Sequence, residues 1–314
     1  MECTSFTNAA SQPRLRDVLS QAGQILASAG SQSAELDAEV LLGHALAMTR
    51  EQIIVMADSP LGAEPAERFQ SLLARRLQRE PVAYIIGRQE FWSLDFQVTR
   101  DVLIPRPETE RLIEVALRLA AQSRSDKPLR VLDIGTGSGA IAVSIAKEIR
   151  LARIYATDIS PSALAIARRN ATLNGVIERI IFRCGDLYAA IADQKAQFDL
   201  IVANPPYIRR AEIATLNPEV SQWEPSAALD GGADGLDFYR RIAAQAGQFL
   251  APKGTIALEI GAGMGSEVLP ILIQAGPFQD VKIVHDYAGR ERVAVARVAT
   301  DPAIQIQEAS AWTG

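Results

Sequence analysis

The sequence predicts an α/β protein in which a Rossmann-like sheet of seven strands follows a small helical bundle. Short apolar runs alternate with helical patterns from Leu112 onward, as expected for parallel strands joined by helices. The last two runs, 281–287 and 292–298, are separated only by a short turn around Gly289, which predicts an antiparallel hairpin. The sheet should therefore be parallel except at this end.

The first part of the chain predicts four helical segments. Apolar residues recur at helical spacing over 13–29, 33–48, 52–57 and 65–78, and Pro81 ends the bundle. The residues expected to face inward are Leu15, Val18, Leu19, Ile25, Val40, Leu41, Leu42 and Ala45. A group of arginines could form a basic surface for an acidic partner, but a solvated helix face is the simpler interpretation. These arginines are Arg75, Arg76, Arg79 and Arg88.

The remaining strands are expected at 130–135, 153–159, 180–186, 198–203 and 254–260. Between the bundle and the sheet, the aromatic residues of 91–96 predict a hairpin that could cover a bound cofactor. We expect a helical domain at 1–80, a hairpin linker at 81–106, an α/β domain at 107–300 and a flexible tail at 301–314.

Composition narrows the function. The chain has 314 residues and a formal net charge of −5, which disfavours a protein that grips nucleic acid by its phosphates. Its two cysteines, Cys3 and Cys184, give neither a disulfide framework nor metal spacing, and Cys184 is expected to be a buried strand residue. Residues 1–10 show no basic-then-apolar leader, and no apolar run is long enough for a membrane span. We expect a soluble cytoplasmic monomer without a metal.

A glycine loop follows the strand expected at 130–135. Its residues, which should bind a nucleotide-like cofactor, are Gly135, Thr136, Gly137, Ser138 and Gly139. Glycines allow the backbone to approach a ligand closely, and the helix that begins at Ala140 adds a partial positive charge. Asp158 ends the next strand, about 20 to 25 residues further on, where a ribose diol would bind.

Asp133 decides between two kinds of cofactor. A carboxylate just before the glycines would repel the pyrophosphate of a dinucleotide, whereas it would attract the cationic methionine part of S-adenosylmethionine. Asp186, which ends the third strand of the series, could accept a hydrogen bond from the adenine amino group, and Leu187 could pack on the adenine ring. Carboxylates at successive strand ends therefore favour the adenosyl cofactor.

The tetrad Asn204-Pro205-Pro206-Tyr207 follows the apolar run 198–203 and predicts the substrate site. Proline fixes φ, so the carbonyl groups of Asn204 and Pro205 should point in set directions and accept hydrogen bonds from a substrate –NH2 group. Tyr207 can stack on a planar substrate. An ordinary exit from a strand is the alternative for this tetrad taken alone.

With these motifs, the chain resembles the HemK/PrmC type of class I S-adenosylmethionine-dependent methyltransferases, the peptide chain release factor N(5)-glutamine methyltransferases. The resemblance implies that the tetrad binds the glutamine of the release factor's Gly-Gly-Gln motif, with Asn204, Pro205 and Tyr207 as its catalytic members. It also implies that the methyl donor, which becomes S-adenosylhomocysteine, contacts Asp133, the glycine loop, Asp158, Asp186, Leu187 and Asn204. Leu187 is a departure, because some relatives carry Asp-Trp at the matching positions.

The tetrad alone indicates an amino group as acceptor without saying which. Enzymes that methylate a ribosomal protein glutamine, DNA adenine or ribosomal RNA guanine share it and stay as alternatives. The segment 87–96 and the run Arg106-Pro107-Glu108-Thr109-Glu110 resemble the release factor enzymes, as does 224–236, which we expect beside the substrate cleft. The resemblance implies release factors as partners, with no stable nucleic acid or membrane contact. Neither His44 nor His285 is needed for the reaction.

Overall fold

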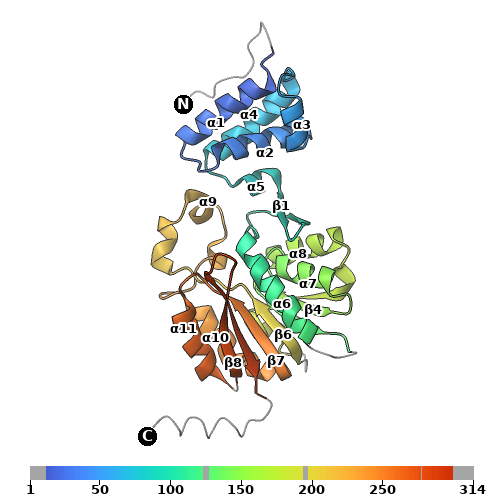
Figure 1. Ribbon diagram of the computed structural model, residues 1–314, viewed down its shortest axis with the longest axis vertical. Helices are drawn as coiled ribbons and strands as arrows, with labels where there is room; N and C mark the ends of the chain where they lie inside the picture. The colour runs from blue at the N-terminus through green and yellow to red at the C-terminus, as the bar shows by residue number, and fades with distance from the viewer. Residues whose placement is uncertain (1–11, 123–126, 194–196, 277, 300–314) are drawn as a thin grey trace. The chain divides into compact units, whose positions relative to one another are not determined.

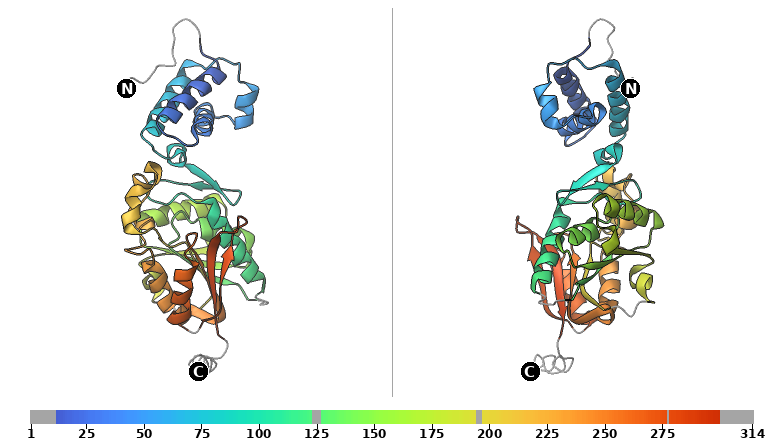
Figure 2. Two further views of the ribbon diagram at one scale, coloured as in Figure 1. Left: turned by 60° about the vertical axis from the view of Figure 1, so that its left-hand side comes forward. Right: turned by 90° about the vertical axis from the view of Figure 1, so that its right-hand side faces the viewer.

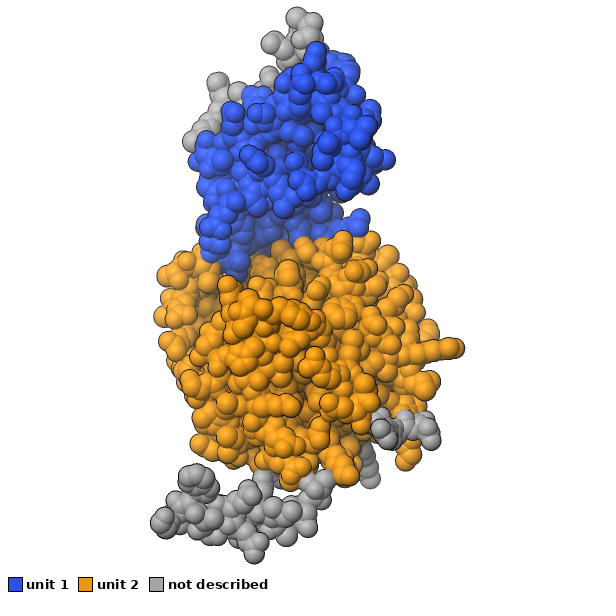
Figure 3. All heavy atoms as spheres, in the orientation of Figure 1, with its two compact units in different colours: residues 1–88, 217–223 blue, residues 89–216, 224–314 orange. Residues whose placement is uncertain are grey.

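The computed structural model describes residues 12–122, 127–193, 197–276 and 278–299. The chain divides into two compact units, which Figure 3 distinguishes by colour. One comprises residues 1–88 together with 217–223, and the other comprises 89–216 and 224–314. The first unit is therefore built from two separate stretches of sequence. The second contains the sheet and all the residues predicted for the site.

The first unit is helical, as the sequence predicts. Its helices are α1 (Leu15–Ser28), α2 (Ala34–Leu46), α3 (Arg50–Val55), α4 (Ala63–Leu77), α5 (Val82–Ile86) and α9 (Pro218–Ser221). Apolar side chains of the first five form one core around Leu41, Leu42 and Phe69. Thr49 begins α3 with a capping box, because its hydroxyl accepts from Gln52 N while the Gln52 side chain accepts from Thr49 N. Ile25 and Val40 are only half-buried, and Leu26 takes the inward position on α1.

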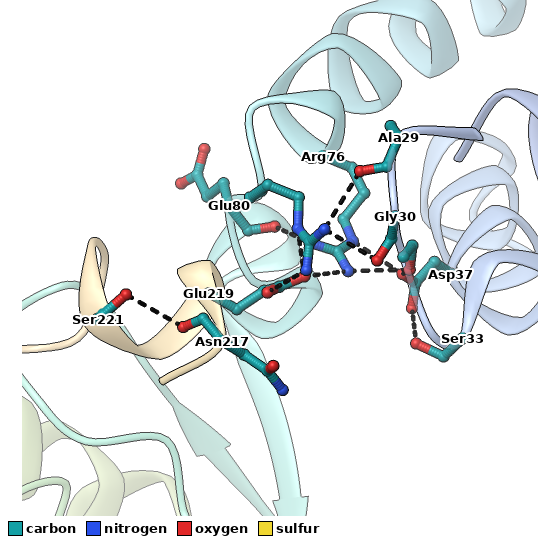
Figure 4. A network of polar contacts seen from close by, with 11 residues as sticks. Ala29, Gly30, Ser33, Asp37, Arg76, Glu80, Asn217, Glu219 and Ser221 are labelled. Carbon is teal, nitrogen blue, oxygen red and sulfur yellow. Dashed lines mark hydrogen bonds and ion pairs between the residues drawn. The ribbon is translucent and has the colours of Figure 1, made fainter. Parts of the chain in front are cut away.

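The interpretation of the bundle arginines as a solvated helix face is wrong for Arg76. Its side chain is 5% exposed, and Nε donates to Asp37 Oδ2 at 2.8 Å. Its Nη2 donates to Glu219 Oε1, also at 2.8 Å, and Arg79 donates to both oxygens of the same carboxylate. Figure 4 shows Glu219 directed at these groups from α9. Arg76 and Arg79 therefore act inside the unit, where their charges hold residues 217–223.

The second unit contains a sheet of seven strands in the order β5-β4-β3-β6-β7-β9-β8 (Figure 1). The strands are β3 (Arg130–Ile134), β4 (Arg153–Asp158), β5 (Ile180–Cys184), β6 (Phe198–Ala203), β7 (Leu250–Glu259), β8 (Phe278–His285) and β9 (Glu291–Val298). Strands β3 to β7 pair in parallel, while β9 pairs antiparallel with both β7 and β8. The predicted fold class and its terminal hairpin are confirmed.

Helices cover both faces of this sheet (Figures 1 and 2). Helices α6 (Glu110–Gln122), α7 (Ala140–Glu148) and α8 (Pro161–Leu173) pack on one face, while α10 (Asp237–Phe249) and α11 (Gly265–Ala275) pack on the other. An apolar core lies on each face of the sheet, the first under α6, α7 and α8 and the second under α10 and α11. Successive strand residues alternate between them: Val131 belongs to the first core and Leu132 to the second. Burial on both sides explains why the central strands read as continuous apolar runs.

The elements that complete the second unit are short. The hairpin predicted around the aromatic residues is present, as strands β1 (Arg88–Phe91) and β2 (Leu94–Gln97). The 3₁₀ turns are η1 (Pro107–Thr109), η2 (Ile177–Arg179), η3 (Leu187–Ile191), η4 (Arg210–Thr215) and η5 (Ser226–Ala228).

The prediction that Cys184 is buried is wrong, because it ends β5 at the edge of the sheet and is exposed. Cys3 lies outside the described residues. None of the helices in the described ranges combines the length and apolarity that a membrane crossing needs.

Candidate active site

The order of the strands brings the predicted site residues to the carboxyl ends of the strands, on one side of the sheet. From β3 the chain moves outward through β4 and β5, and it then returns to β6 on the opposite side of β3. Ligands of open parallel sheets bind at the carboxyl ends of the strands, where the order reverses in this way. Asp133 precedes the glycine loop on β3, and Asn204 follows β6, so the two flank this point.

Asp133 is fully buried, and Thr136 Oγ1 donates to its Oδ2 at 2.6 Å. Burial raises the pKa of Asp133 to about 7, although the hydrogen bond from Thr136 opposes the rise. Among the described residues, its Oδ1 has no hydrogen-bond partner. A buried carboxylate with one oxygen left over is a place where a cationic ligand group would be stabilised.

The glycine loop is held by the neighbouring strand. Gly135 N and Thr136 N both donate to Thr157 O at 2.8 Å, and Gly137 N donates to Asp158 Oδ2 at 2.9 Å. A Cβ atom added at Gly135 or Gly137 would meet no atom within 4 Å, so the loop faces open space. Exposed backbone, this space and the unused Asp133 oxygen together fit the methionine end of an adenosyl cofactor.

Asp158 ends β4 and also accepts from Ser160 N at 2.9 Å, which fixes the carboxylate at the start of α8. Asp186 is exposed and forms an ion pair with Arg241 of α10. Leu187 adopts a positive φ of 48° and packs partly against the second core. Asp158 thus lies directly on the glycine loop, whereas Asp186 and Leu187 lie one strand further out.

The first residue of the tetrad, Asn204, is held by a hydrogen bond to the buried Thr109. Asn204 Nδ2 donates to Thr109 Oγ1 at 3.1 Å, and Thr109 is 4% exposed at the end of η1. Pro205 is buried, while Pro206 and Tyr207 are half-buried. Burial raises the pKa of the Tyr207 hydroxyl to about 12, and the charge of Glu259 adds to the rise. Thr109 belongs to the Arg-Pro-Glu-Thr-Glu run, so this run has a structural connection to the tetrad.

The segment 224–236 lies against the tetrad, as expected. Ile208 N donates to Leu229 O, and Gly231 N donates back to Ile208 O. A Cβ atom at Gly231 would lie 2.8 Å from Tyr207 Cα, and one at Gly235 would lie 2.5 Å from Tyr207 O. Only glycine allows this approach of two backbones, and at Gly235 it also provides a φ of +81°. The start of the segment is anchored by an ion pair between Arg106 and the buried Glu224.

Sequence reasoning did not identify Glu259 at the end of β7. It is 1% exposed, and hydrogen bonding from Thr109 and Asn204 lowers the pKa of its carboxylate. Burial raises the pKa of Glu259 to about 7 despite these bonds and the nearby charge of Arg292. Its carboxylate follows an apolar strand, like Asp133 and Asp158, and this pattern was the available signal. His44 and His285 are both exposed.

The fold and the comparisons define a methyltransferase. The family model for the methyltransferase small domain matches residues 115–218, and the one for the PrmC N-terminal domain matches residues 17–87. The crystal structure of the hMettl16 catalytic domain shares the fold with a TM-score of 0.52 and 18% sequence identity. That comparison covers 73% of this chain and 82% of the other.

Two curated relatives identify the family. The release factor glutamine methyltransferase of Cereibacter sphaeroides is 45% identical over 285 residues, which cover 91% of this chain and 99% of the relative. The protein of the same name from Geobacter sulfurreducens is 44% identical, with 90% and 96% covered. The chain belongs to the family of release factor glutamine methyltransferases, and the sequence-based prediction of this family is confirmed.

Proposed function

We propose that the chain transfers a methyl group from S-adenosylmethionine to the side-chain amide nitrogen of the glutamine in the Gly-Gly-Gln motif of peptide chain release factors. The observation that carries the proposal is the placement of Asn204 and Asp133 on neighbouring strands at the switch point of the sheet. One offers acceptors to an amide –NH2 group, and the other offers a negative charge to a cationic donor.

The donor would bind along the glycine loop. Asp133 would face its methionine part, the backbone of Gly135 to Gly139 would lie under it, and Asp158 would accept from the ribose hydroxyls. Asp186 and Leu187 are proposed for the adenine end. When bound, S-adenosylmethionine supplies an electrophilic methyl group on a sulfonium and leaves as S-adenosylhomocysteine.

The tetrad would act by positioning and electrostatics. An amide nitrogen is a poor nucleophile because its lone pair is delocalised, and the carbonyl groups of Asn204 and Pro205 would hold its hydrogens so that the lone pair turns toward the methyl group. Tyr207 would pack on the planar amide. The nitrogen gains the methyl group and loses one proton, which passes to water, so no general base is required.

The names of the relatives favour release factors over a ribosomal protein, DNA or ribosomal RNA as acceptor. The helical unit would serve in recognition of the release factor, and the protein would work as a monomer in the cytoplasm, where translation terminates.

Transfer of labelled methyl to purified release factor tests the proposal. A release factor with alanine in place of the Gly-Gly-Gln glutamine is the control, and ribosomes and total RNA are parallel acceptors. We expect label only on the unchanged release factor. Label on ribosomal protein or RNA would show that the chain methylates that acceptor and not release factors. Absence of label from every acceptor would overturn the proposed activity.

A further inference from the structure

Three polar side chains meet at the first residue of the tetrad, and each comes from a different element. Asn204 follows β6, Thr109 ends η1, and Glu259 ends β7. Thr109 and Glu259 are 4% and 1% exposed, so neither is positioned to touch a substrate directly. Buried polar groups of this kind are normally fully paired, and their pairing fixes side-chain orientation.

The chemistry of the three groups sets the direction of their hydrogen bonds. An ionised carboxylate only accepts, so in the hydrogen bonding by which Thr109 and Asn204 lower the pKa of Glu259, the carboxylate is the acceptor. Asn204 Nδ2 also donates to Thr109 Oγ1, at 3.1 Å. Thr109 therefore accepts from Asn204, which leaves its own hydroxyl proton available to Glu259. The Asn204 Nδ2 group is therefore directed into the protein, toward Thr109.

An asparagine amide can rotate by half a turn, which exchanges its donor and its acceptor. With the donor engaged inward, the acceptor Oδ1 is left for a substrate –NH2 group. We propose that Thr109 and Glu259 are positioning residues, which hold the Asn204 amide so that Oδ1 meets the substrate nitrogen. This inference rests on the proposed function, because it assumes an –NH2 acceptor.

The charge of Glu259 is central to this arrangement. A protonated Glu259 would have a hydrogen to donate, and it could then pair with Asn204 Oδ1 instead of Nδ2. The charged and titratable groups around it are Arg292 on β9, Glu108 on η1, Tyr207 of the tetrad and Tyr239 on α10. Its other oxygen, Oε2, has no hydrogen-bond partner among the described residues. We expect the favoured orientation of Asn204 to be held while Glu259 is ionised.

Thr109→Val tests the inference, because it removes the hydroxyl and keeps the shape. We expect a fall in kcat of at least about tenfold, with the release factor KM and the donor Kd changed by less than about threefold. Thr109→Ser, which keeps the hydroxyl, should restore most of the loss. Glu259→Gln retains an acceptor and should keep measurable activity, but it should lose the decline of kcat that we expect for the wild type below about pH 7.

The double variant Thr109→Val with Asn204→Ala separates positioning from structure. If Thr109 acts through Asn204, the double variant should be no slower than Asn204→Ala alone, because nothing remains to orient. An equal fall in kcat in both backgrounds would overturn the inference. A wild type inactive on release factor would overturn the proposed function instead. Unchanged kcat in Thr109→Val, with an active wild type, would overturn only this inference.

Discussion

Arg76 of α4 and Glu219 of α9 form an ion pair between residues 143 positions apart in the sequence. Burial alone would raise the pKa of Glu219, but hydrogen bonds from Arg79 and Arg76 outweigh it and lower the pKa. Arg76 is also paired with Asp37, and both of these side chains are buried. The Glu219 carboxylate therefore adds a further charge to a buried ion pair. The pair fixes the short segment 217–223 within the helical unit.

Glu219→Gln should loosen this segment. The amide keeps one acceptor but loses the charge and the second acceptor that Arg79 uses, at a cost of about 1 to 3 kcal/mol, so the amides of 220–222 should exchange about tenfold or more faster. Hydrogen exchange with mass spectrometry measures this directly. The control is Glu212→Gln, because Glu212 forms only an exposed pair with Arg209 at 4.0 Å. Equal exchange in the two variants would remove Glu219 as the anchor.

Asn204→Ala should lower turnover by about a hundredfold or more, because it removes an acceptor aimed at the reacting nitrogen. Donor affinity should stay within about threefold, since the glycine loop and Asp158 are untouched. Single-turnover methyl transfer and donor titration give the two quantities separately. Matching losses in turnover and donor affinity would contradict the assigned role.

Asp158→Ala should weaken donor binding at least about tenfold. The carboxylate accepts from Gly137 N and Ser160 N, and its loss also frees the glycine loop. Ser160→Ala is a matched control on the same turn, because it removes only the cap of α8, where Ser160 Oγ accepts from Ala163 N. That control should unfold at a lower temperature while keeping its donor affinity. An Asp158→Ala variant with wild-type affinity would exclude the residue from the site.

Gly235→Ala should impair turnover through the tetrad. The added Cβ would lie 2.5 Å from Tyr207 O, so either the tetrad or the loop must shift. Gly289→Ala is the control, because its φ of +76° carries a similar strain but its Cβ would meet nothing within 4 Å. Kinetic constants and unfolding temperatures of both variants test this. A similar fall in kcat for the two would show that strain alone accounts for the effect.

The buried Asp133 predicts a pH dependence of stability. Its pKa is raised from 3.8 to about 7, so the folded state keeps a proton that the unfolded state has lost. The contribution of this group to the free energy of unfolding is full below about pH 4 and declines by about 4 kcal/mol as pH rises through about 7. Asp133→Asn, measured by urea unfolding across this range, should flatten the decline. A slope unchanged by the substitution would show that other groups produce it.

The sequence predicted the sheet well because its strands are bounded by strong local signals. The run 198–203 is apolar and ends at Asn-Pro, and its predicted bounds coincide with β6. Cys184 was misplaced because an apolar strand reads the same at the centre and at the edge of a sheet. Its exposure follows from the strand order, which local sequence does not determine.

The parts that local patterns could not predict depend on distant partners. Arg76 has the sequence of a surface helix residue, and only folding brings Asp37 and Glu219 to it. Likewise, Thr109 was noted only as part of a run that resembles the release factor enzymes, and the Asn204 that it contacts lies 95 positions away. The predicted donor and substrate residues lie along one edge of the sheet, and their individual roles stay predictions for the experiments above.

The helical unit cannot be separated from the rest of the chain by a single cut. Its residues 217–223 are inserted between Leu216 and Glu224 of the other unit, so a fragment beginning at Gln89 would carry α9 without Arg76 and Arg79. A chimaera that takes its helical unit from a relative must therefore exchange the short insertion as well as the N-terminal segment. The two stretches form one structural unit, although more than a hundred residues of chain lie between them.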